Sequence, residues 1–258
     1  MRATRWALTL LAGFSANAAH AACPDKPTLD TLTKMGSVFI GEEHGTNESP
    51  AFVRCVVEHD IASGMHPTVA LEQSSTSRDL ASDDWLGTDG RHSKAMAALV
   101  VWLLAREKAG AVKLHWLDDY TKSGDTRDHD MGESLVPLLA EGPVIAYAGN
   151  VHAQKSQRMM QGYDVKPAGE YAGAAMVHVL LAPSGPGSAW NCIGTCGVHT
   201  QKGGVFSAKP GTLVPAASLG RDFLLGYDYV YSIASFTASP PSRQATHTPA
   251  TAPATPHP

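Results

Sequence analysis

The stretch VFIGEEHGTNES, residues 38–49, joins a short apolar segment to a cluster of polar side chains. The segment SVFIG (37–41), which begins one residue earlier, has the β-branched and aromatic content of a buried strand. Glu42, Glu43 and His44 follow directly. Charged groups at the end of a core strand need partners, and later segments of the chain supply candidates.

Three later apolar segments end in polar residues in the same way. They are HPTVALEQ (66–73) with Glu72, VKLHWLDD (112–119) with Asp118 and Asp119, and PVIAYAG (143–149), which precedes Asn150 and His152. Two further strands are predicted, AMVHVLLA (175–182) and YDYVYSIASF (227–236), and the second is expected to close the sheet. Helical patterns at 51–64, 93–110 and 128–142 lie between the strands.

The alternation of helices with near-continuous apolar strands predicts the fold class. It is typical of an α/β protein with a mostly parallel central sheet and helices on both faces. We expect a single domain over residues 22–236, with a Gly/Pro-rich insertion at 183–212 that contains Cys192 and Cys196. Residues 237–258 are rich in Pro, Thr and Ala without periodicity, which predicts a disordered tail.

The N-terminus predicts export. The apolar segment ALTLLAGF (7–14) follows a basic start, is too short to span a bilayer, and precedes an A-x-A cleavage site that ends at Ala21. We therefore predict a signal peptide over residues 1–21 and a periplasmic or secreted protein. A lipid anchor at Cys23 is the less favoured alternative, because lipoprotein signals usually carry an aliphatic residue where His20 stands.

Charge and hydropathy exclude some classes of partner. The formal net charge is −4 and there are no basic runs, which argues against nucleic-acid binding. No segment after the signal peptide is long and apolar enough to predict a transmembrane helix.

Four cysteines would remain after export into an oxidising compartment. Cys192 and Cys196 can close a small loop, which leaves Cys23 and Cys55 as the second pair. A metal site formed by the first two cysteines and His199 is the alternative, and the compartment favours the disulfide.

The carboxyl ends of parallel strands meet at one edge of a sheet, where ligands bind. The candidate site residues there are Glu42, Glu43, His44, Glu72 and His152. Two histidines with several carboxylates can bind a divalent metal that activates water. Alternatively, a histidine oriented by a carboxylate can act as a general base without a metal.

Several polar residues have plainer interpretations. Asp118 and Asp119 are predicted to cap a helix or turn, and His115 and His178 to be hydrogen-bonded core histidines. Motifs for serine hydrolases, zincins and dinucleotide enzymes are absent from the sequence.

Three short motifs resemble those of the erythromycin esterase/ChaN-like/Tiki superfamily. They are G-E-x-H at 41–44, L-E at 71–72 and G-N-x-H at 149–152. HGTNE (44–48) with Arg54 on the next helix is similar to the erythromycin esterases. The short chain and the export signal are closer to the ChaN-like haem-binding branch, which is slightly favoured.

The resemblance implies three different activities. Resemblance to the erythromycin esterases implies that His44 is the base that activates water. Resemblance to the Tiki-like peptidases implies a bound metal, and resemblance to the ChaN-like proteins implies haem or iron binding. We expect an exported hydrolase acting on an ester or amide of a small molecule or peptide, with Arg54 stabilising an oxyanion. Glu42, His44, Glu72 and His152 would hold a metal if one is used. The alternatives are a haem- or iron-binding protein, with His44 and His152 as ligands, and a non-catalytic binding module.

Overall fold

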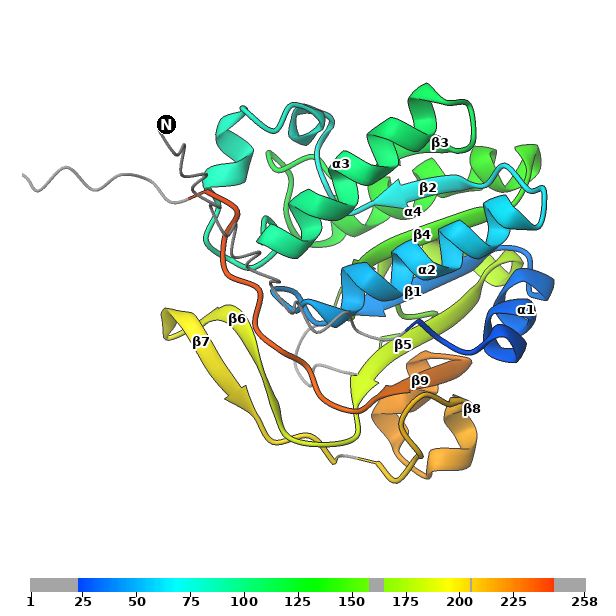
Figure 1. The fold of residues 1–258 in the computed structure, drawn as a ribbon, viewed down its shortest axis with the longest axis vertical. Coiled ribbons are helices and arrows are strands. Elements are labelled where there is room, and N and C mark those ends of the chain that lie inside the picture. Colours follow the sequence, from blue (N-terminus) through cyan, green and yellow to red (C-terminus); the bar gives the residue numbers. More distant parts are fainter. Residues whose placement is uncertain (1–22, 158–164, 205, 244–258) are drawn as a thin grey trace, which may run out of the picture.

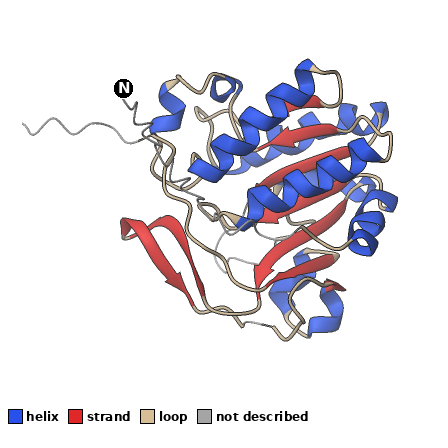
Figure 2. Ribbon diagram, viewed as in Figure 1, coloured by secondary structure: helices blue, strands red, loops and turns tan. Residues whose placement is uncertain are grey.

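The fold is described from a computed structural model, over residues 23–157, 165–204 and 206–243. The predicted signal peptide and all but the first seven residues of the predicted tail lie outside this part of the chain. Figures 1 and 2 show one central sheet with helices packed on it and a separate hairpin at one side.

Seven strands form the central sheet in the order β3-β2-β4-β1-β5-β9-β8. Every pairing is parallel except that of β8 with β9, so the predicted α/β class is confirmed. The sheet strands are β1 (Val38–Glu42), β2 (Thr68–Leu71), β3 (Lys113–Trp116), β4 (Val144–Gly149), β5 (Val177–Pro183), β8 (Leu213–Pro215) and β9 (Tyr229–Ile233). The five α-helices are α1 (Lys26–Lys34), α2 (Glu48–Ala62), α3 (Lys94–Lys108), α4 (Gly124–Glu141) and α5 (Ala168–Ala172), and five short 3-10 helices, η1 to η5, lie in the connections.

Helices cover both faces of the sheet because successive strand residues point to opposite sides. In β1, Val38 and Ile40 pack with α1, α2 and α3, whereas Phe39 packs with α4 and α5 on the other face. Both cores are apolar and fully buried. The strands therefore read as continuous apolar runs.

The structure differs from the sequence-based expectation at the sheet edge. The segment predicted to close the sheet becomes β9, but β8 pairs with it and forms the edge instead. β8 has only three residues and ends in proline, so the sequence shows no recognisable strand pattern there. Helix α1 was likewise not predicted, and Asp25 caps it by accepting a hydrogen bond from the amide of Thr28.

The insertion forms an antiparallel hairpin of β6 (Gly187–Ile193) and β7 (Thr195–Gln201). A disulfide joins Cys192 to Cys196 across its end, and a second joins Cys23 to Cys55, as predicted. The cysteines are therefore not available for the alternative metal site with His199. Two disulfides are consistent with an oxidising, extracytoplasmic compartment.

Residues 237–243, which the composition assigned to the tail, run along the edge of the sheet at which the parallel strands end (Figure 1). The amide of Ser239 donates to the carbonyl of Gly45, and the amide of Lys94 donates to the carbonyl of Pro240. Ser239 is completely buried. This segment packs against the loop that carries His44 and thus belongs to the folded domain.

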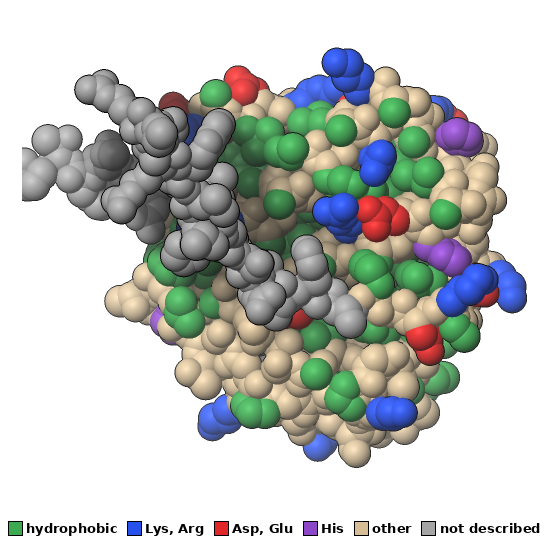
Figure 3. Space-filling model, viewed as in Figure 1, with side chains coloured by type: hydrophobic (Ala, Val, Ile, Leu, Met, Phe, Trp, Pro, Cys, Tyr) green, Lys and Arg blue, Asp and Glu red, His purple; other side chains and the backbone are tan. Residues whose placement is uncertain are grey.

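Helices in the described ranges are all too short or too polar to cross a bilayer. On the face shown in Figure 3, acidic and basic side chains are interspersed among small apolar patches. That visible face has no continuous basic strip.

Candidate functional site

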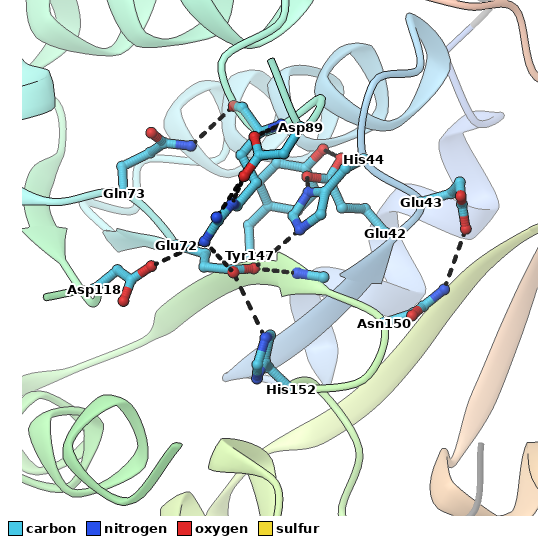
Figure 4. A network of polar contacts seen from close by, with 12 residues as sticks. Glu42, Glu43, His44, Glu72, Gln73, Asp89, Asp118, Tyr147, Asn150 and His152 are labelled. Atoms are coloured by element: carbon cyan, nitrogen blue, oxygen red, sulfur yellow. Dashed lines mark hydrogen bonds and ion pairs between the residues drawn. The ribbon is translucent and has the colours of Figure 1, made fainter. Parts of the chain in front are cut away.

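Strand order brings the polar strand ends together. β3, β2, β4 and β1 are consecutive neighbours in the sheet, so the residues that follow them meet at one edge (Figure 4). Gly149 at the end of β4 allows close contact, because a Cβ there would lie 2.7 Å from Nε2 of His44. Its amide donates a 2.6 Å hydrogen bond to Oε2 of Glu72. The glycine of G-N-x-H therefore lets two site residues approach the backbone.

Glu42 and His44 form a carboxylate–imidazole pair. Nδ1 of His44 donates to Oε1 of Glu42 at 2.8 Å, and the hydroxyl of Tyr147 donates to the other carboxylate oxygen. Glu42 is 6 % exposed, and these two contacts hold its buried carboxylate in place. This arrangement leaves Nε2 as the nitrogen of His44 that faces the site.

Nε2 of His44 lies 3.5 Å from Oε2 of Glu72. Burial of the ring opposes its protonation, but the charges of Glu72 and Glu42 outweigh burial and raise the pKa of His44 to about 9. Among the described residues, no N–H group donates to this nitrogen. His44 can therefore take up a proton, and it retains that proton strongly.

Arg127, from the first turn of α4, lies at the centre of the site and was not predicted. It donates to Glu72 at 2.5 Å and to both oxygens of Asp118 at 2.8 and 2.6 Å. Burial opposes ionisation of Glu72, but His152, His44 and the two arginines Arg127 and Arg91 hold the pKa of its carboxyl well below the usual range. Asp118, expected to be a cap, is instead a buried ion-pair partner, whereas Asp119 does accept a turn hydrogen bond from Thr121.

His152 forms a second imidazole–carboxylate pair on the other side of Glu72. Its Nδ1 lies 2.7 Å from Oδ1 of Asp128, which also accepts from the amide of Ala168. Its Nε2 lies 2.9 Å from Nη1 of Arg127, and a guanidinium can only donate. The imidazole therefore donates at Nδ1 and accepts at Nε2.

Two of the expected site residues lie outside this centre. Glu43 points to Asn150, whose amide is 3.5 Å away, and burial raises the pKa of Glu43. Arg54 lies on the exposed side of α2, pairs with Glu58 and stacks on Trp102. It does not reach the site, so the positive charge there comes from other arginines.

A second arginine, Arg91, comes from the polar loop before α3. Its Nε donates to Asp89 at 2.6 Å, and the guanidinium lies over the ring of Tyr120. The Tyr120 hydroxyl donates to Gln73, which in turn donates to the carbonyl of Arg91. No periodicity marks this loop in the sequence. The sequence did contain a signal for Arg127. It lies in the first turn of a helix that follows a parallel strand, and such helices begin at the sheet edge where the strands end.

The expected metal set does not fit this arrangement. Oε1 of Glu72 and Nε2 of His152, two atoms that would ligate, are both occupied by Arg127. Within the described ranges, no three His, Cys, Asp or Glu side chains are placed to hold a metal ion. A cavity of about 260 Å³ beside Arg127 has a polar lining, and neither His44 nor His152 is among its lining residues.

Comparison with solved structures shows the same fold. A succinoglycan biosynthesis protein matches with a TM-score of 0.55 and 10 % identity, covering 83 % of this chain and 91 % of that one. A Bacillus cereus protein matches with a TM-score of 0.55 and 14 % identity, over 86 % and 97 % of the two chains. A mutant of the erythromycin esterase EreC in its open conformation matches with a TM-score of 0.52 and 10 % identity, over 84 % and 95 %.

Neither a protein-family profile nor a curated protein sequence matches the chain. At such low identities the structural matches establish the fold alone. The resemblance indicated by the short motifs is thus confirmed at the level of the fold, which the chain shares with an erythromycin esterase.

Proposed function

We propose that this protein is an exported hydrolase that cleaves an ester or amide bond with water activated by His44. The observation that carries the proposal is the pair formed by Glu42 and His44, with Nε2 of His44 directed into the site. A carboxylate that holds Nδ1 of a histidine orients its Nε2 for proton transfer. A fold shared with an erythromycin esterase supports the same class of reaction.

The proposed reaction begins with neutral His44. Its Nε2 takes a proton from water, the resulting hydroxide attacks the carbonyl carbon, and the C–O or C–N bond breaks. The imidazolium then returns the proton to the leaving group. Glu42 and Glu72 stabilise the imidazolium, because both carboxylates lie next to the ring. Arg127 supplies the positive charge near the developing oxyanion that was expected from Arg54.

Haem or iron binding is the alternative function, with His44 and His152 as ligands. Both histidines lie at the same sheet edge, but Nε2 of His152 accepts from Arg127 and would have to leave it. A non-catalytic binding module would keep the fold and the ion pairs without turnover.

The test compares purified mature protein with the His44→Asn variant on a panel of aryl esters and peptides. Asparagine keeps a donor close to Nδ1 and removes Nε2, so the contact with Glu42 can persist. We expect hydrolysis by the wild type and a loss of about 10²–10⁴-fold in the variant. Retained hydrolysis by a folded variant would refute His44 as the base. A haemin complex with a shifted Soret band, abolished in this variant while esters are not cleaved, would establish the alternative.

A further inference from the structure

A cavity of about 260 Å³ opens beside Arg127, the arginine at the centre of the candidate site. It is lined by Arg91, Tyr120, Lys122, Ser123, Gly124 and Arg127. Three of these six residues are cationic and none is acidic. The cavity is connected to the site through Arg127, which contacts both Glu72 and His152.

Of the acidic partners of the two arginines, Glu72 and Asp118 are buried, Asp89 is partly exposed, and none of the three is among the lining residues. The side chains of Glu72 and Asp118 are 3 % and 0 % exposed, whereas that of Arg91 is 27 % exposed. The carboxylates thus keep the guanidinium groups in place, and the lining of the cavity contains three cationic side chains and no carboxylate. Lys122 pairs with Asp130 and Asp119, which are not among the lining residues.

Some N–H groups of Arg91 make no hydrogen bond to the described part of the chain. Its Nε and Nη2 contact Asp89, but its Nη1 lies 3.8 Å from Glu72 and 3.6 Å from Asp118. Both distances exceed a hydrogen bond, so within the described part of the chain Nη1 has no acceptor. Nη1 carries two of the five N–H groups of a guanidinium. These two donors can bind an additional anionic oxygen.

The N-terminus of α4 faces the same cavity. This helix has 18 residues, and its N-cap, Ser123, makes no side-chain hydrogen bond to the first turn. The first-turn amides of a helix carry partial positive charge and bind anions. A Cβ built on Gly124 would meet nothing within 4 Å, so the space beside the first residue of the helix is open.

We propose that this cavity binds an anionic group, a carboxylate or a phosphate, carried by the substrate next to the bond that is cleaved. The inference rests on the proposed hydrolase and narrows its substrates to acidic esters or amides. Arg91 would bind the anion with its spare N–H groups, and Lys122 and the start of α4 would add positive charge.

The first experiment measures binding without catalysis. Inorganic phosphate, and separately acetate, is added at fixed ionic strength and the thermal unfolding midpoint is compared with that in chloride. A ligand that binds only the folded state raises the midpoint, and the rise grows with the logarithm of the ligand concentration above its Kd. We expect a rise in the wild type and in Lys113→Gln, and a smaller rise in Lys122→Gln. Lys113 is the matched control because it also forms a surface ion pair, with Glu141, but is not among the lining residues.

Ser123→Asp separates binding from folding. Aspartate is a good N-cap and favours the helix dipole, so the variant is expected to be at least as stable as the wild type. Its carboxylate would compete for the cations of the cavity, and the rise with phosphate or acetate should disappear. An equal rise in all variants would overturn the proposal, as would no rise in the wild type.

The second experiment measures selectivity. The 4-nitrophenyl monoesters of succinate, glutarate and adipate are compared with the methyl-capped diesters of the same chain length. We expect kcat/KM to favour the anionic member for at least one length, and Lys122→Gln to reduce that preference about 3–10-fold through KM.

Equal use of both members by an active enzyme would overturn this inference and leave the hydrolase proposal standing. Anion binding by a protein that cleaves nothing would refute the hydrolase proposal alone. A preference for phosphate over acetate in the first experiment would identify the anion as a phosphate.

Discussion

The two histidines on either side of Glu72 make the same kind of contact through Nδ1 and different contacts through Nε2. Each places Nδ1 on a carboxylate, Glu42 for His44 and Asp128 for His152. They differ at Nε2, which lies near Glu72 in both rings, at 3.5 Å in His44 and 3.7 Å in His152, but accepts from the guanidinium of Arg127 only in His152. A neighbouring carboxylate stabilises a proton on Nε2, whereas an N–H donor occupies its lone pair. We therefore expect the neighbour of Nε2, rather than the carboxylate on Nδ1, to distinguish the proposed base, His44, from His152, which would position Arg127.

The largest expected effect separates the two histidines directly. His44→Asn and His152→Asn both retain a donor near the position of Nδ1 and both delete Nε2. We expect kcat to fall about 10²–10⁴-fold for His44→Asn, because it removes proton transfer. For His152→Asn we expect about a tenfold loss or less, because only an acceptor for Arg127 is removed. Steady-state kinetics on the best substrate of the panel measures both, with circular dichroism as the check on folding. Equal losses in the two variants would contradict the distinction.

Arg127 should be more important to stability than any other cation of the site. Arg127→Gln leaves the carboxylates of Glu72 and Asp118 buried without their main partner. Removing one member of a buried ion pair typically costs about 3–5 kcal/mol, because the other charge remains buried. Urea unfolding measures the change in free energy of unfolding.

Arg54→Gln is the matched control for that measurement. Arg54 has an exposed i,i+4 pair with Glu58, and such pairs contribute at most about 1 kcal/mol. If both arginine variants lost the same stability, the charges around Glu72 would not be the buried network described above.

The sequence predicted the part of the site that follows from strand order. Glu42, His44, Glu72 and His152 come directly after apolar strands, and a parallel sheet brings such residues to one edge. It failed for residues whose position depends on side-chain direction. Arg54 follows a buried valine and precedes a buried cysteine on α2, and its own side chain points to solvent.

Loop geometry limited the rest of the prediction. Arg91 comes from a polar loop without periodicity, and its place is set by tertiary contacts with Asp89 and Tyr120. Residues 237–243 have the composition of a disordered tail, yet backbone hydrogen bonds to the loop after β1 and to the start of α3 hold them in the fold. The composition of a segment indicates how much apolar surface it can bury. It does not indicate which backbone N–H and C=O groups in other parts of the fold need a hydrogen-bond partner from that segment.

The smallest effect concerns pH, where activity and stability should change in opposite directions. His44 would act as a base only when neutral, so kcat/KM should rise with pH, reach half its maximum near pH 9, where the pKa of His44 lies, and level off above that pH. His152→Asn should keep this limb of the profile, because it leaves His44 intact. A limb centred near the ordinary pKa of histidine, about 6.5, would show that Glu72 and Glu42 do not raise the pKa of His44.

Stability supplies the independent half of the pH prediction. The folded-state pKa of His44 is above its unfolded value, so folding takes up a proton and is favoured by the charged ring at low pH. This contribution is complete below about pH 6.5 and is lost as the pH rises through about 9. The difference in free energy of unfolding between wild type and His44→Asn should therefore shrink over that window, by roughly 1–3 kcal/mol. Because the same carboxylates strengthen the base and stabilise its protonated form, a difference independent of pH would contradict both roles at once.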